Sequence, residues 1–274
     1  MIRQKIIELH WLLSSQFGLD LRNFFRSIRG IPIFIKDWGR FREGYSGKMT
    51  FKPCLHDRYE EGGSTKNEYF WQDLVVARWI FEAQPLRHVD VGSRVDGFVA
   101  HVASFREIEV FDVRPITTQI QGIVFKQANV MTLDTELAGS GYCDSLSCLH
   151  AIEHFGLGRY GDPINPLGYE SGIANMAKLL KPGGRFYLST PVGKERVEFN
   201  ANRIFAPSTI IQCAESNDLR IHQLMVIGAG GAVREVQPTQ SVYDQLSKEN
   251  YNLAIFVFTK QSNAIDDQLS VTPL

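Results

Sequence analysis

The residues best able to do chemistry stand in one segment, CDSLSCLHAIEHFGLGRYGDP, at residues 143–163. Its centre holds His150, Glu153 and His154, which have the spacing His-x-x-Glu-His. On one face of a helix, such residues can bind zinc through two imidazoles and activate water through the carboxylate. At the end of a buried strand, they can instead serve as general acid and base without a metal. The surrounding sequence has to decide between these two kinds of chemistry.

The residues around this motif favour the second interpretation. An apolar run precedes it, and the nine residues FGLGRYGDP that follow contain three glycines and a proline. They leave room for at most one helical turn. A zinc site would also need a further ligand, and nothing singles out one of Glu215, Glu235 and Glu249. We therefore expect no metal and keep a zinc hydrolase as an alternative.

The composition is that of a globular protein. Of 274 residues, 44% are hydrophobic, which suffices for one large domain or a domain with an appendage. A net charge of −1 excludes nucleic-acid binding driven by bulk charge, so we expect no nucleic-acid partner. The four cysteines have no paired spacing, and we expect neither a signal peptide nor a membrane span. These features predict a cytoplasmic protein.

The N-terminal part differs in charge from the remainder. Residues 1–53 contain ten Lys and Arg and four acidic residues, which gives a net charge of +6. Residues 1–30 place apolar and basic residues at helical spacing. This pattern predicts either a helix packed on the domain or an amphipathic element that lies on an anionic membrane or docks a partner. We expect a basic, amphipathic extension at 1–58 and a second domain at 59–274.

The second domain alternates strands and helices. Helices are expected at 69–83, 95–105, 168–180 and 207–217, and strands at 87–93, 107–115, 122–130, 143–150, 185–191, 220–228 and 252–260. Helices between apolar strands indicate an α/β fold with a Rossmann-like, doubly wound, mostly parallel sheet that is covered on both faces. Ligands of such sheets bind at the carboxyl ends of the strands.

Polar residues gather at the expected strand ends. Asp90 and Gly92 end one strand, and Asp112 ends the next, twenty residues after Gly92. The glycines do not form the G-x-G-x-x-G dinucleotide motif. A carboxylate at the position of Asp112 can accept hydrogen bonds from the two hydroxyls of a ribose, or it can cap a helix or pair with Arg114. We favour the ribose.

The order of the motifs VDVGSR, VFDVRP, FKQANV, DSLSCLHAIEHF and LLKPGGRFYLSTP resembles that of the class I S-adenosylmethionine-dependent methyltransferases, over about residues 70–260. HVDVGSRVDGF, HAIEHFGLGRYGDP and RIFAP further resemble a bacterial family of unknown function that is grouped with these enzymes and associated with surface-polysaccharide biosynthesis. One departure is Arg94, which stands where the methyltransferase loop has small residues.

The resemblance implies seven strands, the last of which, at 252–260, inserts antiparallel between its neighbours. It also implies S-adenosyl-L-methionine as cofactor. Asp90, Gly92 and Ser93 would line its methionine end, Asp112 would hold the ribose, Val113 and Asn129 would contact the adenine, and Cys148, Leu149 and His150 would flank the sulfonium.

These observations predict a methyltransferase that O-methylates a saccharide or another polar small molecule in surface-glycan biosynthesis. The proton of the attacking hydroxyl needs an acceptor, for which we expect His154 oriented by Glu153, with His150 in the same cluster. Asp162 is an outside candidate, and the loop 193–207 could contact the acceptor or be a solvated surface loop. A non-catalytic methyltransferase-like module in a membrane-associated assembly is the alternative from another class. The enzyme is expected in the cytoplasm, with possible peripheral attachment to the inner face of the membrane through residues 1–58.

Overall fold

The computed structural model describes residues 2–133 and 141–262. The chain forms two compact units, Met1–Ser64 and Thr65–Leu274. Each unit has its own helices, and only the second contains strands among the described residues.

The first unit consists of two helices and a returning segment. α1 (Ile2–Phe17) is followed by α2 (Leu21–Gly44), and a short 3₁₀ turn, η1 (Asp57–Tyr59), lies in the returning segment. Gly18 has φ +69° between the helices, and the Asp20 carboxylate caps α2 by accepting from the backbone N–H of Asn23. Residues 1–30, where the spacing of apolar residues predicted a helix, thus contain α1 and the first part of α2. The second helix continues beyond residue 30 and through Pro32.

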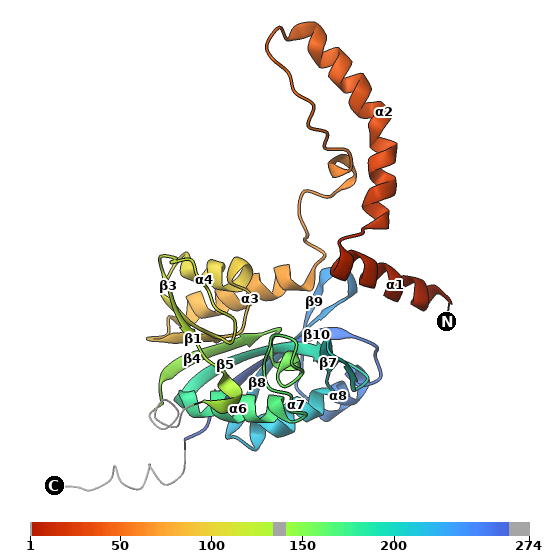
Figure 1. The fold of residues 1–274 in the computed structure, drawn as a ribbon. Coiled ribbons are helices and arrows are strands. Elements are labelled where there is room, and N and C mark those ends of the chain that lie inside the picture. The colour runs from red at the N-terminus through yellow and green to blue at the C-terminus, as the bar shows by residue number, and fades with distance from the viewer. Residues whose placement is uncertain (1, 134–140, 263–274) are drawn as a thin grey trace, which may run out of the picture. The chain divides into compact units, whose positions relative to one another are not determined.

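The second unit is built on one sheet with the order β3-β2-β1-β4-β5-β10-β8-β9 (Figure 1). The first five strands in this order pair in parallel, whereas β10 runs antiparallel between β5 and β8. The strands are β1 (His88–Val91), β2 (Ile108–Asp112), β3 (Ile123–Gln127), β4 (Cys143–Leu149), β5 (Leu180–Val192), β8 (Leu219–Gly228), β9 (Ala232–Val236) and β10 (Asn252–Lys260). The reversed strand confirms the sheet that the resemblance implies.

One strand more than expected completes the sheet. β9 pairs antiparallel with β8 after a turn in which Gly230 and Gly231 have positive φ. Its residues are half-buried or exposed, because β9 lies at the edge of the sheet. Such a short, polar edge strand lacks the apolar run by which the other strands are recognised in the sequence.

Helices cover both faces of the sheet. α3 (Glu68–Ala83), the π-turn η2 (Val95–Val99) and α4 (Ala100–Ala103) pack on one face, over a core that includes Leu149 and Ile255. α6 (Gly168–Leu179), α7 (Pro207–Glu215) and α8 (Gln240–Leu246) pack on the other, over a core that includes Leu188 and Phe256 (Figure 1). Adjacent residues of β10 thus face opposite cores, as expected for a doubly wound sheet.

The sequence KPGG, residues 181–184, forms a turn within the fifth strand. Cys143 pairs with Leu180 and Ser145 with Arg185, so residues 181–184 bulge out of the strand, with Gly183 at φ +77°. Beyond β5, the segment expected as a loop forms a hairpin, β6 (Arg196–Glu198) with β7 (Asn202–Ile204). The remaining 3₁₀ turns are η3 (Val130–Thr132), η4 (Ile152–His154) and η5 (Ala229–Gly231).

Candidate functional site

The ends of β1, β2 and β4 meet at the carboxyl edge of the sheet. The backbone N–H of Gly92 donates to the carbonyl of Phe111 at 2.9 Å, which ties the end of β1 to the end of β2. The backbone N–H of Leu149 donates to Oγ of Ser93 at 3.1 Å, which ties β4 to β1. The residues that the sequence places at these strand ends are therefore close together in space.

Asp90 and Ser93 are turned toward each other at the end of β1. Oδ1 of Asp90 accepts from the hydroxyl of Ser93 at 2.6 Å and from that of Ser147 at 2.5 Å, and Oδ2 accepts from the backbone N–H of Ser93. Burial raises the pKa of Asp90 to about 7, against the lowering effect of these hydrogen bonds. Asp90 thus holds the turn after β1 in shape, and contact between its side chain and a cofactor stays a prediction.

The turn after β1 needs a glycine. Gly92 has φ +72°, and a Cβ there would lie 3.1 Å from Cβ of Ala151. Arg94 follows two residues later, and its guanidinium pairs with the Asp96 carboxylate at 2.8 Å, where both side chains are exposed. The guanidinium also lies 5.5 Å from the ring centre of Tyr69. The guanidinium of Arg94 is therefore held in place by Asp96 and Tyr69.

Asp112, at the end of β2, is occupied by Arg114. Oδ1 of Asp112 accepts from the backbone N–H and from Nε of Arg114, at 2.8 and 3.0 Å, and Oδ2 accepts from Nη2 at 2.6 Å. The guanidinium of Arg114 lies 4.5 Å from the ring centre of Tyr160. The pairing that the sequence left open as the alternative to a ribose is thus present, and Oδ2 keeps room for another donor.

The two residues expected near an adenine take part in local structure. Oδ1 of Asn129 caps η3 by accepting from the backbone N–H of Met131 at 3.0 Å. The carbonyl of Val113 accepts from Nε2 of Gln127 at 2.9 Å. Both lie after strands β3 and β2 at the same edge as Asp112, and their contact with a ligand stays a prediction.

His150 lies between two carboxylates at the end of β4. Its Nδ1 lies 2.5 Å from Oε1 of Glu153, which is fully buried, and its Nε2 lies 3.0 Å from Oε1 of Glu68. The ring stacks on Tyr69, with 4.5 Å between centroids, and Glu68 also accepts from the hydroxyl of Tyr251. The backbone of His150 has φ +54°, a strained conformation that such a surrounding network can hold.

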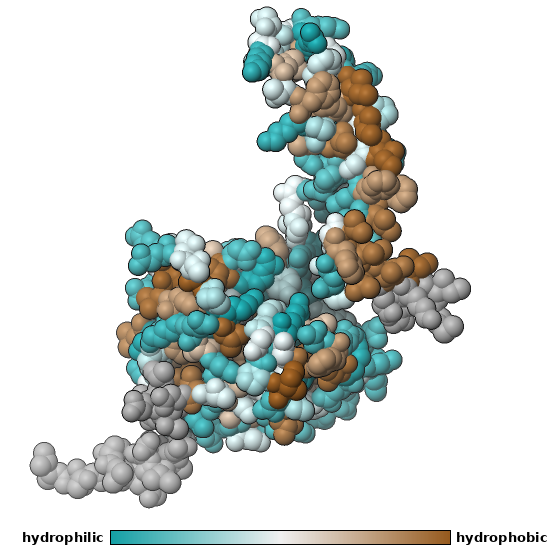
Figure 2. All heavy atoms as spheres, viewed as in Figure 1, coloured by the Kyte–Doolittle hydropathy of each residue, from teal (hydrophilic) through white to brown (hydrophobic). Residues whose placement is uncertain are grey.

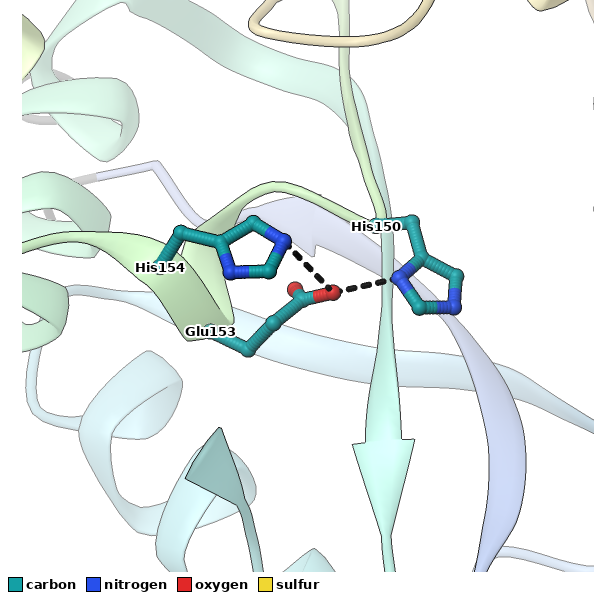
Figure 3. Close-up of side chains that lie close together, drawn as sticks. All are labelled: His150, Glu153 and His154. Carbon is teal, nitrogen blue, oxygen red and sulfur yellow. Dashed lines mark hydrogen bonds and ion pairs between the residues drawn. The ribbon is translucent and has the colours of Figure 1, made fainter. Parts of the chain in front are cut away.

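His154 completes the cluster from the other side of Glu153, whose carboxylate lies between the two imidazoles in Figure 3. Nε2 of His154 is 3.8 Å from Oε1 of Glu153, and its ring meets Tyr160 edge to face at 5.5 Å. Because Tyr160 also contacts Arg114, it links the histidine cluster to Asp112. Glu153 contacts His150 more closely than it contacts His154, the residue that it was expected to orient.

The two histidines have opposite charge preferences. Burial opposes a charge on His150, but the two carboxylates outweigh it and raise the pKa to about 9. Burial lowers the pKa of His154, although Glu153 opposes the shift. The pKa of Glu153 is lowered because His150 outweighs the effect of burial. At neutral pH, the cluster therefore contains one imidazolium, one carboxylate and one neutral imidazole that can accept a proton.

The same three side chains could hold a metal ion, since the ligand atoms of His150, Glu153 and His154 all lie within 4.8 Å of one another. The helix of a zinc peptidase does not form, however. His150 directly follows the last residue of β4, and only the single turn η4 comes after it. Nδ1 of His150 is engaged by Oε1 of Glu153, which contacts it at 2.5 Å.

The loop after η4 is fixed by Asp162, the outside candidate for the base, and by Arg203, which belongs to the loop 193–207. Arg203, which is 5% exposed, donates to four backbone carbonyls. These belong to Glu153, Phe155, Asn165 and Pro166, with donor–acceptor distances between 2.6 and 3.4 Å. Asp162 accepts from the backbone N–H groups of Gly156, Gly158 and Tyr160. Asp162 is thus a loop-forming residue, and Arg203 belongs to the protein interior rather than to a solvated loop.

The N-terminal turn of α3 supplies site residues that sequence reasoning missed. Glu68 and Tyr69 contact His150, and the hydroxyl of Ser189 donates to Gln72, while Ser189 Oγ accepts from the backbone N–H of His150. Asn67 caps this helix, so a polar start to α3 was visible in the sequence. No pattern in the sequence relates Glu68 to a histidine eighty-two residues further on.

A family model described as a Caenorhabditis protein of unknown function, DUF268, matches residues 130–212. This range contains His150, Glu153 and His154, and its description carries no indication of a glycan substrate. Comparison with curated proteins gives no match.

Solved structures with a similar course of the chain include several methyltransferases. A 1,6-didemethyltoxoflavin-N1-methyltransferase of Burkholderia thailandensis, with bound 1,6-didemethyltoxoflavin and S-adenosylhomocysteine, is 12% identical, with a TM-score of 0.49 over 73% of this chain and 80% of its own. The N-methyltransferase NodS of Bradyrhizobium japonicum, in complex with S-adenosylhomocysteine, is also 12% identical, with a TM-score of 0.48 over 74% of this chain and 90% of its own. The fold assignment for the present chain rests on its own strand order and not on these structures.

Proposed function

We propose that the chain is an S-adenosylmethionine-dependent methyltransferase that methylates a hydroxyl of a saccharide or another polar small molecule. The observation that carries this proposal is the sheet, in which β10 is reversed between β5 and β8, with Asp90, Asp112 and His150 at the carboxyl ends of neighbouring strands. Ligands of open α/β sheets bind at this edge. The cytoplasmic setting and the role in surface-glycan biosynthesis belong to the same proposal.

The residues present fit an adenosine-bearing cofactor. Gly92 leaves no side chain where the backbone would approach a ligand. Asp112 is 8% exposed and its Oδ2 can accept another hydrogen bond, while Arg114, its present partner, has a half-exposed side chain that can turn into solvent. An ion pair that is partly exposed contributes only about 0–1 kcal/mol, so a ribose could replace it.

When bound, the cofactor would supply a methyl group on a sulfonium, which a hydroxyl oxygen takes as the carbon–sulfur bond breaks. The residues of the chain then have to position the hydroxyl and accept its proton. We assign this proton to Nε2 of His154, because the ring is neutral at neutral pH and Glu153 would stabilise the charge it gains. His150 is already protonated at neutral pH, so it cannot accept this proton. Its hydrogen bond to Glu153 instead holds that carboxylate in position.

Calorimetric titration with S-adenosylmethionine and S-adenosylhomocysteine tests the proposal. We expect binding of both, and a loss of at least about tenfold in affinity for Asp112→Asn, since a hydrogen bond to a charged group contributes about 1.5–3 kcal/mol. Asp244→Asn, an exposed residue on α8, is the matched control and should bind like the unsubstituted chain. Absence of binding at millimolar concentration would remove the proposal.

A second candidate is a methyltransferase-like module that binds or scaffolds without catalysis. The observation in its favour is that Asp112 is paired with Arg114, and Asp90 with Ser93 and Ser147, within the chain itself. Cofactor binding without methyl transfer to any extracted glycan fraction would support it. Release of S-adenosylhomocysteine in the presence of such a fraction, together with its loss in His154→Gln, would decide for the enzyme.

A further inference from the structure

The two faces of α2 have different surroundings within the first unit. One face packs on the returning segment: a Cβ on Gly30 would collide with the carbonyl of Leu55, and Trp38 contacts Phe51 with 5.0 Å between ring centres. Asp37 on this face pairs with Arg58 at 3.0 Å. This side of the helix is thus already covered by residues of its own unit.

The other face of α2 carries a stripe of exposed apolar side chains. Six residues at helical spacing are between 43% and 66% exposed: Leu21, Phe24, Phe25, Ile28, Ile31 and Ile35. In Figure 2, brown side chains follow one side of α2. α1 adds further exposed apolar residues, among them Trp11 and Phe17. A continuous apolar stripe of this size marks an interaction surface.

A row of cations runs beside this stripe. Arg22, Arg29 and Lys36 repeat every seven residues, so they project from nearly the same side of the helix, and Arg40 continues the row one turn later. All four are exposed. The carboxylate of Asp37 faces Arg58 on the covered side and does not neutralise the row. The uncovered part of α2 thus combines apolar contact with positive charge.

We propose that α2 lies in the plane of an anionic phospholipid surface, with its apolar stripe among the acyl chains and its cationic row at the headgroups. Helices that combine an apolar face with a strongly charged face bind membranes in this way. Among the described residues, no helix is both long and apolar enough to cross a bilayer. The charge of the row selects anionic lipid over neutral lipid.

Co-sedimentation of the full chain with lipid vesicles tests this proposal. We expect binding to vesicles that contain phosphatidylserine and much weaker binding to phosphatidylcholine alone. Lys36→Glu should weaken binding to the anionic vesicles at least about fivefold, since each cation near such a surface contributes about that factor. Ile28→Asp should weaken it further, because a carboxylate would enter the apolar stripe.

Two control variants match these changes elsewhere in the chain. Lys248→Glu changes a cation outside the first unit, and Leu86→Asp changes an apolar residue that is 88% exposed, and both should bind as the unsubstituted chain does. Circular dichroism shows whether Ile28→Asp keeps its helices. If the helices are lost, the test rests on the vesicle binding of Lys36→Glu. Equal binding to both kinds of vesicle, binding to neither, or a dimer in solution that Ile28→Asp dissociates would overturn the proposal. None of these outcomes depends on cofactor binding.

Discussion

Nδ1 of His150 lies 2.5 Å from Oε1 of Glu153, a carboxylate with no exposed surface. A buried carboxylate requires a charged or hydrogen-bonded partner, because its isolation from water is costly. The imidazolium of His150 is this partner, and Glu68 holds its other nitrogen. The pair therefore fixes the protonation states from which any chemistry at this edge of the sheet must begin.

The two histidines should titrate far apart. In NMR spectra of histidine-labelled protein, we expect the pKa of His150 to be about 9 and that of His154 to lie below the ordinary value of about 6.5. Signals are assigned with His150→Gln and His154→Gln. Glu153→Gln should move the His150 midpoint downward, because it removes the nearest charge. A His150 midpoint at or below the ordinary value would contradict the ion pair.

Stability should depend on pH through the same pair. The pKa of His150 is raised in the folded state, so its stabilising contribution is complete below about pH 6.5 and is lost as pH rises through about 9. We therefore expect the difference in free energy of unfolding between the unsubstituted chain and His150→Gln to shrink over this range. Urea titrations at several pH values measure it, and a difference that grows toward pH 9 would reverse the assignment.

Arg114 should compete with the cofactor for Asp112. Arg114→Ala frees both carboxylate oxygens, so we expect S-adenosylhomocysteine to bind up to about fivefold more tightly, the factor that corresponds to a partly exposed ion pair. Asp112→Asn should act in the opposite direction. Arg220→Ala on β8 removes the same charge from an exposed position and serves as control in the calorimetric titration. Weaker binding to Arg114→Ala would mean that the arginine itself holds the ligand.

Arg203 should matter for stability rather than for acceptor binding. Arg203→Met keeps the length of the side chain but leaves buried carbonyls without donors, and one hydrogen bond to a charged group contributes about 1.5–3 kcal/mol. We expect a loss of about 3 kcal/mol in urea unfolding, within the range of large single-residue effects. The exposed Arg78→Met on α3 should change the free energy by less than about 0.5 kcal/mol.

Metal should be dispensable. Zinc on the histidine cluster would have to displace the proton that His150 shares with Glu153 and neutralise an imidazole with a raised pKa. We expect purified protein to contain no stoichiometric zinc by elemental analysis, and EDTA to leave its melting temperature unchanged. One zinc per chain, lost together with stability in His154→Gln, would revive the hydrolase.

The fold was predictable where strands are apolar and end at a recognisable turn. Asp90, Asp112 and His150 each close such a run, and parallel strands bring their ends to one edge. β9 and the β6–β7 hairpin could not be found in this way, because half-exposed residues carry no clear period. Helical spacing was recognised only over residues 1–30, yet α2 continues through Pro32 to Gly44.

The sequence allowed the residues of the site to be predicted, but not the contacts that they make with other residues. The sequence indicates that His150, Glu153 and His154 lie together, since the last follows the first by only four positions. It cannot show that Glu68 reaches His150, or that Arg203 enters the interior, because these contacts join distant parts of the chain. Nor does it decide between a ribose and Arg114 as the partner of Asp112.

The position of β10 in the sheet affects the order in which the strands can pair during synthesis on the ribosome. β5 ends at Val192, but its neighbour in the sheet begins only at Asn252, so one edge of β5 stays bare while some sixty residues are synthesised. Parallel strands β1 to β5 can assemble during this time, whereas β8 has no place in the sheet until β10 emerges. Nascent chains that stall before β10 should therefore be the ones that chaperones retain.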